Sequence, residues 1–447
     1  MKIYHNGIQF HSKLLKIRTI CIALFIIYSV VYLTNIHLLL ANALELSSNA
    51  ISGQNISYNN LNNELDSAIL AEMNKYDIIG VSAAFVKDGQ VIWSNGYGWS
   101  DLEENKQATP DTIYRLASIS KTITATALMQ LWEQGKFGLD DDISNYLGFE
   151  VRNPNYPDDK ITFRMLLTHT SSILDGSSQG GYNKAINSTN PPLLKDLLER
   201  SGSAYSDLTW GNYRPGTNFN YSNFCAGIIA CLVEKISGEG FEQYTIDHIF
   251  KPLGMDAAYD AADITNVDDI AVLYRLSGDD IVPVYDDFQA GEKPQKREYG
   301  LPLGNYYIGP AGGVRASVTD LAKFMIAHMN GGVYNDARIL NKGTVDLMQQ
   351  MQWSGNGLGG FYRQMGLIFH ITDQLAGRTL VGHAGEAYGL VSDMYFDPVN
   401  NCGVIFVTNG GNYSFLSNGF TNIETAVINH IFNKLANSPV ALTSNMT

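Results

Sequence analysis

Strand patterns lie at both ends of the chain with helix patterns between them, and this arrangement restricts the fold more than any other feature. Apolar runs bounded by turn residues predict strands. They cover residues 80–86, 91–93, 378–383, 390–396 and 403–407. The first two flank Asp88-Gly89, a hairpin signal. We therefore expect the two ends of the chain to build one antiparallel sheet.

Helix patterns fill the middle of the chain and recur at its end. Apolar residues repeat with a helical period in residues 61–76, 116–134, 162–168, 193–200, 223–236, 241–249 and 420–435. We expect an α+β fold (an α/β sandwich) in which helices flank the sheet and a mostly helical lobe, about residues 123–300, is inserted. Residues 61–437 would form one domain, followed by a tail at residues 438–447.

Residues 1–43 have the pattern of a secretory signal peptide. Four basic residues precede an apolar run: Lys2, Lys13, Lys16 and Arg18. An A-x-A site ends at Ala43, where cleavage is expected. The alternative is an uncleaved membrane anchor at residues 20–40, about long enough to cross a bilayer. Both interpretations place the protein outside the cytoplasm, either secreted or periplasmic after cleavage, or membrane-anchored. The polar residues 44–60 would be a linker.

The chain is acidic, which excludes one class of partner. It has 30 Lys and Arg against 44 Asp and Glu, a formal net charge of −14. All four charged residues of the leader are basic, so the remainder is more acidic still. Without a basic cluster in the body, the attraction to backbone phosphates that drives nucleic-acid binding is missing. We expect no nucleic-acid partner.

Cysteine and histidine usage points to no metal and no cofactor. Three cysteines follow the leader: Cys225, Cys231 and Cys402. Cys225 and Cys231 stand six residues apart on different faces of one predicted helix, so at most one disulfide is possible, through Cys402. Three buried thiols are the favoured alternative. The histidines are scattered, without zinc-ligand spacing.

Ser118 and Lys121 form an S-x-x-K pattern. A chain of this length holds about one such match by chance, so the context carries the argument. Ser118 falls at the start of a predicted helix, where the helix dipole favours negative charge on its oxygen. Lys121 lies on the same helix face and can take the serine proton if burial keeps its amine neutral. The alternative is a capping serine beside a solvent-facing lysine.

Two further short motifs stand where a loop or a strand end can present their side chains to a substrate. Tyr221 and Asn223 form a Y-x-N pattern before a predicted helix, so a loop presents the tyrosine. His383 and Gly385 form an H-x-G pattern at the end of a predicted strand. A small residue there lets a substrate backbone lie close to the strand.

The three motifs, in this order, resemble those of one family. The chain is similar to the class C β-lactamase family, which also includes serine D-Ala-D-Ala carboxypeptidases, D-aminopeptidases and carboxylesterases. The resemblance extends to residues 114–121, 166–172 and 309–314 and covers most of residues 61–436. It implies a β-lactamase/transpeptidase-like fold and catalysis through a covalent acyl-enzyme, without a metal ion.

The resemblance assigns roles to the first two motifs. Ser118 would be the acylated nucleophile, and Lys121 would share proton transfer with Tyr221. Asn223 would hold Lys121 and the substrate amide. Whether Lys121 or Tyr221 is the general base stays open at this point.

The third motif departs from that of the true β-lactamases, which carry Lys-Thr-Gly. Here His383, Ala384 and Gly385 would form the substrate strand, with His383 charged in part near neutral pH. The backbone N–H groups of Ser118 and Glu386 would form the oxyanion hole. The missing lysine and the added acidic side chain of Glu386 disfavour anionic substrates such as penicillins.

The expected function is therefore an extracytoplasmic serine hydrolase of the esterase or D-amino-acid peptidase type. Its substrate would be a small-molecule or peptide ester, amide or lactam. The alternatives are a true β-lactamase and a penicillin-binding sensor or scaffolding protein that does not turn over. Membrane association through residues 20–40 and the oligomeric state stay open.

Two other features are not assigned to catalysis. Ser178 is the middle residue of a G-x-S-x-G match at residues 176–180. A nucleophile elbow needs a strand before the serine and a helix after it, whereas a polar loop surrounds this match. His169 follows a predicted helix, and we assign it a turn role.

Overall fold

The computed structural model describes residues 63–277, 280–285, 292, 294–296 and 300–438. The chain divides into two compact units, residues 1–66 and 67–447. Of the first unit, residues 63–66 are described and are helical. The leader, the linker and nearly all of the tail that we predicted lie outside the described residues. All that follows concerns the second unit.

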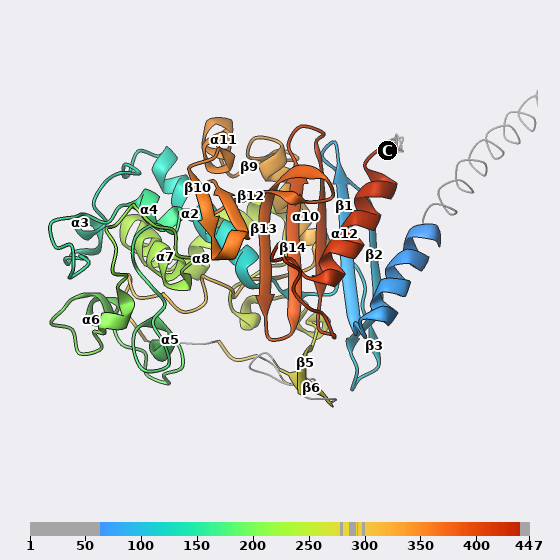
Figure 1. Ribbon diagram of the computed structural model, residues 1–447, viewed down its shortest axis with the longest axis horizontal. Coiled ribbons are helices and arrows are strands. Elements are labelled where there is room, and N and C mark those ends of the chain that lie inside the picture. Colours follow the sequence, from blue (N-terminus) through green and yellow to red (C-terminus); the bar gives the residue numbers. More distant parts are fainter. Residues whose placement is uncertain (1–62, 278–279, 286–291, 293, 297–299, 439–447) are drawn as a thin grey trace, which may run out of the picture. The chain divides into compact units, whose positions relative to one another are not determined.

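A nine-stranded antiparallel sheet dominates the second unit (Figure 1). In spatial order its strands are β10 (Trp353–Gly357), β11 (Tyr362–Met365), β12 (His370–Leu375), β13 (Arg378–Ala387), β14 (Leu390–Asp397), β15 (Cys402–Thr408), β1 (Gly80–Lys87), β2 (Gln90–Asp101) and β3 (Lys106–Gln107). Three two-stranded pairs accompany it: β4 (Tyr114–Arg115) with β7 (Arg315–Ala316), β5 (Leu273–Ser277) with β6 (Asp280–Val284), and β8 (Val333–Tyr334) with β9 (Ala337–Arg338).

The α-helices are mostly short outside four longer elements. They are α2 (Ser120–Glu133), α3 (Ser144–Leu147), α4 (Phe163–Leu167), α5 (Tyr182–Ala185), α6 (Leu194–Leu198), α7 (Asn223–Ser237), α8 (Phe241–Thr245), α9 (Lys251–Leu253), α10 (Val318–Met329), α11 (Lys342–Gln349) and α12 (Asn422–Leu435). Residues 67–75 are also helical, and a 3-10 turn, η1 (Ala117–Ile119), precedes α2.

The sheet joins the two ends of the chain, which confirms the predicted fold class. β1 pairs with β15, with Val81 opposite Thr408. Helix α10 packs on β1, β2, β14 and β15, while α12 packs on β12, β14 and β15. Successive side chains of β1 point to opposite faces: Ala84 joins the core that contains α10, and Phe85 meets Phe432 of α12 edge to face at 5.3 Å. The sheet is thus covered on both faces.

The helical lobe is organised around α2 and α7, which pack together. Every residue of α2 from Ser120 to Leu131 is buried, so this helix forms the middle of the lobe. Gly135, with φ of 73°, ends it in the left-handed conformation that glycine adopts at little cost. Ser222 caps α7, its hydroxyl oxygen accepting from the Cys225 N–H.

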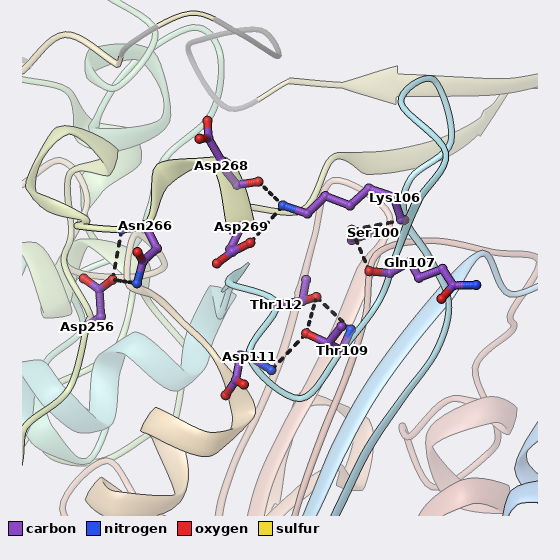
Figure 2. A network of polar contacts seen from close by, with 10 residues as sticks. All are labelled: Ser100, Lys106, Gln107, Thr109, Asp111, Thr112, Asp256, Asn266, Asp268 and Asp269. Atoms are coloured by element: carbon purple, nitrogen blue, oxygen red, sulfur yellow. Dashed lines mark hydrogen bonds and ion pairs between the residues drawn. The ribbon is translucent and has the colours of Figure 1, made fainter.

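A polar network fixes the segment that leads into the Ser118 turn (Figure 2). The Lys106 amine donates to the Asp268 carbonyl and, at 2.9 Å, to the Asp269 carboxylate. Within the loop after β3, the Thr109 N–H donates to the Thr112 hydroxyl at 2.9 Å. Backbone bonds of Ile113 to residues 269 and 271 continue the attachment. These contacts attach the segment before β4 to residues 268–271 and so fix the position from which β4 begins.

Cys225, Cys231 and Cys402 are buried free thiols, as the favoured alternative predicted.

Within the described residues, no helix is both long and apolar enough to span a membrane.

Candidate active site

Ser118 lies in the η1 turn, between β4 and the buried start of α2. Leu116 anchors the turn, because its side chain is fully buried and its N–H donates to the Val314 carbonyl at 2.8 Å. Ala117 has φ of 44°, an uncommon left-handed conformation for a residue with a side chain. Such strain gathers at functional sites, where surrounding contacts hold it. Here it turns the partly exposed Ser118 toward Lys121.

Lys121 is fully buried and faces the nucleophile. Its amine lies 2.9 Å from the Ser118 hydroxyl oxygen and donates to the Ala311 carbonyl at 2.7 Å. Burial lowers the pKa of this amine to about 7, against the opposing charge of Asp175. A large neutral fraction therefore exists near neutral pH, and in that form the amine has a lone pair that can accept a proton. The solvent-facing alternative for this lysine is wrong.

Tyr221 is held in place by its neighbours. Its ring lies against His169 in a tilted contact, with the ring centroids 4.5 Å apart, and stacks nearly parallel on Tyr362, with the centroids 5.2 Å apart. The Lys121 amine lies 4.9 Å from its centroid. Burial raises the pKa of Tyr221, so the phenol is protonated at neutral pH. The nearby Ser118 and Tyr362 hydroxyls offset part of this rise in pKa. The Tyr221 hydroxyl is nevertheless buried without a well-formed hydrogen bond to any group of the described residues.

Asn223 differs from its expected contact. We expected it to hold Lys121, but its amide nitrogen donates instead to Asp175 at 2.8 Å. The other oxygen of that carboxylate accepts from the Ser222 hydroxyl at 2.8 Å and from the Phe224 N–H at 2.9 Å. Asp175 thus fixes the segment that carries Tyr221 and Asn223, and it acts on Lys121 through its charge.

His383 is neutral, in contrast to the partial charge that we expected. It is fully buried, and burial together with the nearby Lys121 amine lowers its pKa to about 3. Its Nδ1–H donates to the Ala384 carbonyl at 2.6 Å. Nε2 is buried and has no hydrogen-bond partner within the described residues. The ring centroid lies 6.2 Å from that of Tyr221, and no hydrogen bond joins the two side chains.

Gly385 brings the substrate strand against the nucleophile turn. A Cβ atom at this position would lie 2.5 Å from the Ser392 hydroxyl oxygen, 2.7 Å from the Leu116 carbonyl oxygen and 3.0 Å from the Ser118 nitrogen. The described pairs of β13 with β12 end at Gly382, so the last residues of β13 pair with β14 alone. One edge of β13 therefore faces the site beside Ser118.

Gly385→Ala is expected to lower kcat/KM for an ester by about 100-fold and to lower the unfolding midpoint, because backbone atoms cannot yield to the new methyl group. Steady-state kinetics and thermal unfolding measure the two effects. The matched control is Gly343→Ala in α11, where a Cβ atom meets nothing within 4 Å. Normal kinetics of the Gly385 variant would contradict the close approach of β13.

Two cavities of about 440 Å³ each meet at Ser118, Asn223 and Glu386. The first also contains Arg115, Asn183 and Tyr388. The second runs along β13 toward α12 and is lined by Tyr221, Leu358, Phe361, Tyr362, Ala384, Gly385, Val391, Phe415, Gly419, Thr421 and Glu424. A substrate can thus extend to both sides of the serine.

Asp175, Tyr362 and His169 belong to the site but were not assigned to it from the sequence. Asp175 and Tyr362 stand in no motif, so nothing local marks them. His169 does take the turn role that we predicted, with φ of 56°, but its ring also supports Tyr221. In the part of the chain that the structure describes, no group of His, Cys, Asp and Glu side chains is placed to hold a metal ion.

A model of the beta-lactamase family matches residues 65–424. The chain belongs to this family. Its curated relatives include Protein flp of Staphylococcus aureus (strain MW2), 29% identical over 201 residues, which are 44% of this chain and 38% of flp. PbpX of Bacillus subtilis (strain 168) is 32% identical over 255 residues, 57% of this chain and 56% of PbpX. The matches thus span less than two thirds of these relatives.

Solved structures of beta-lactamase-like fold resemble this one over most of its length. The octameric penicillin-binding protein homologue from Pyrococcus abyssi has a TM-score of 0.64 and 25% identity, covering 83% of this chain and 77% of that one. EstCE1, a hydrolase with promiscuous acyltransferase activity, has a TM-score of 0.64 and 22% identity, covering 84% and 100%. The D-amino acid amidase of Ochrobactrum anthropi SV3 has a TM-score of 0.60 and 19% identity, and the match covers 84% of this chain and 100% of the amidase.

Proposed function

We propose that this member of the beta-lactamase family is a serine hydrolase that works through an acyl-enzyme on Ser118. The observation that carries the proposal is the buried Lys121 amine, 2.9 Å from the serine oxygen. An amine whose pKa lies about 7 is a competent general base near neutral pH. A buried lysine this close to a serine has little structural purpose, because burying it costs free energy.

The acylation step follows from this geometry. Ser118 Oγ attacks the substrate carbonyl carbon while Lys121 takes the hydroxyl proton. The N–H groups of Ser118 and Glu386 stabilise the oxyanion. The bond to the leaving group then breaks, and Tyr221 passes a proton to the leaving atom and is reprotonated from Lys121. Water, activated by the same groups, hydrolyses the ester on Ser118 and restores the free enzyme.

Neutral or cationic esters and amides are the proposed substrates, ahead of lactams that carry a carboxylate. Neutral His383 offers no positive charge on the substrate strand, and Glu386 adds negative charge beside it. Support also comes from two neighbours of the same fold, one named as a hydrolase with acyltransferase activity and one as a D-amino acid amidase.

A substrate panel tests this order. Purified protein is assayed with p-nitrophenyl esters, D-amino-acid amides and a chromogenic cephalosporin, and kcat/KM is expected to be largest for an ester or an amide. Much faster cephalosporin turnover would reverse the order and favour a true β-lactamase. A stoichiometric burst without steady-state turnover would favour a penicillin-binding sensor.

We also propose that the protein acts outside the cytoplasm, on the grounds of the residues 1–43 pattern alone. The mass of the mature N-terminus distinguishes cleavage after Ala43 from an anchor at residues 20–40.

A further inference from the structure

Two buried carboxyl groups, Asp393 and Glu424, lie close enough for the charge of one to act on the other, and the acylation step uses neither. Asp393 of β14 is fully buried, and within the described residues neither of its carboxyl oxygens has a hydrogen-bond partner. Glu424 of α12 is 3% exposed and lines the cavity. One of its oxygens accepts from the Thr421 hydroxyl at 2.6 Å. No hydrogen bond joins its other oxygen to a side chain of the described residues.

The register of the sheet places Asp393 on the cavity side. It stands directly opposite Ala384, and paired residues of neighbouring strands point to the same face. Ala384, Glu386 and Val391 on this face all line the cavity. Asp393 therefore points to the same face of the sheet, behind the residues that line the cavity, and within range of the charge of Glu424. An unpaired buried carboxyl group of this kind is costly, so it calls for a partner.

The charges that act directly on the pair are acidic, while Arg275 reaches the neighbouring phenol of Tyr413. Glu386 acts on Glu424 from β13, and Glu424 acts on Asp393. The phenols of Tyr395 and Tyr413 are the other titratable groups whose pKa values feel these carboxylates. Burial raises the pKa of Glu424 to about 7 and that of Asp393 well above its usual value. Asp393 is therefore protonated at neutral pH, and Glu424 is the group of the pair that ionises near and above neutral pH. Neither carboxyl group forms an ion pair within the described residues, so a cation that approaches Glu424 meets no competing partner.

In the proposed mechanism the leaving group departs toward the second cavity. Tyr221, which passes the proton to the leaving atom, lines this cavity and does not line the first. The acyl group would then occupy the first cavity, on the other side of Ser118. A cation bound at Glu424 would thus be carried by the leaving group.

We propose that Glu424, supported by Asp393, binds an ammonium group on the leaving group of the substrate. The inference rests on the proposed function, because the orientation of the substrate follows from acylation of Ser118. It narrows the substrate class to esters and amides whose alcohol or amine portion is positively charged. Glu424 acts here as a specificity-determining residue of the acylation reaction.

Two thioesters that differ by one charge test the proposal. Acetylthiocholine and S-(3,3-dimethylbutyl) thioacetate share the acyl group and the shape of the leaving group, and thiol release reports both. Each kcat/KM is divided by the rate of uncatalysed hydrolysis. We expect the wild-type chain to favour the cationic substrate by about tenfold or more, as one charged contact supports.

Glu424→Gln is expected to lower this preference about tenfold, and Asp393→Asn to lower it less. Glutamine keeps an oxygen that can accept from Thr421, so the helix cap survives. The matched control is Asp373→Asn, which removes one exposed carboxylate outside both cavities and should keep the preference.

Equal turnover of the two thioesters by the wild-type chain would overturn the inference and leave the proposed function standing. An unchanged preference in Glu424→Gln would also overturn it. If neither thioester shows turnover that depends on Ser118 but the substrate panel does, the inference is rejected and the proposed function stands. If no substrate in either test shows turnover that depends on Ser118, both are rejected.

Discussion

Ser118→Ala is expected to lower kcat/KM for an ester by about 10⁴-fold or more, to the level that the oxyanion donors alone provide. The change removes the oxygen that faces the Lys121 amine at 2.9 Å and leaves the η1 turn otherwise intact. Covalent labelling by a fluorescent fluorophosphonate, followed by intact mass, measures acylation directly. The variant should show no added mass.

The matched control is Ser178→Ala in the 176–180 loop. Ser178 is exposed and matches a different nucleophile pattern, so its loss should leave labelling and turnover unchanged. Labelling that persists in Ser118→Ala but disappears in Ser178→Ala would move the nucleophile to that loop and reject the proposed function.

Lys121→Met is expected to lower kcat/KM by about 10³-fold, because the serine loses its general base while the packing volume is retained. In the wild type, the base is the neutral amine, so kcat/KM should rise with pH through an apparent pKa of about 7. Below that value it should fall tenfold per pH unit. Lys136→Met, at an exposed site beyond α2, is the control and should keep both the rate and the profile. A Lys121→Met variant that keeps the wild-type profile would contradict this assignment.

Burial of the Lys121 amine is expected to lower the free energy of unfolding. Its pKa is lower in the folded chain than the ordinary 10.5, so between about pH 7 and pH 10.5 the unfolded chain binds more protons. The free energy of unfolding therefore rises with pH across that window. The destabilisation caused by burying Lys121 is largest below about pH 7. We expect the unfolding midpoint of Lys121→Met at pH 6 to be no lower than that of the wild type.

The sheet was predictable where both of its faces are buried. Every residue of β14 and β15 is buried, and their apolar runs show this directly in the sequence. β10, whose sequence is WSGNG, has one fully buried residue and no apolar run, so we did not predict it. The hairpin of β5 and β6 is mostly exposed and contains Pro283, which likewise gives no strand pattern.

The active site was predictable where its geometry is local. Ser118 and Lys121 are one helical turn apart, so their spacing alone brings them together. Asp175, Asp393 and Glu424 reach the site from separate segments, and only the folded sheet and lobe place them. The charge of His383 was misjudged for the same reason, because its burial depends on strands that the motif does not contain.

The pairing of β1 with β15 has a consequence for synthesis of the protein. During translation β1 leaves the ribosome long before its partner strand does. The η1 turn likewise exists long before β13, the strand that completes its surroundings. Non-local pairing of this kind is slow and leaves an unpaired apolar strand exposed to aggregation. We therefore expect nascent chains that lack β13 to β15 to be inactive and to depend on chaperones, so that hydrolysis begins only once these strands have emerged and paired.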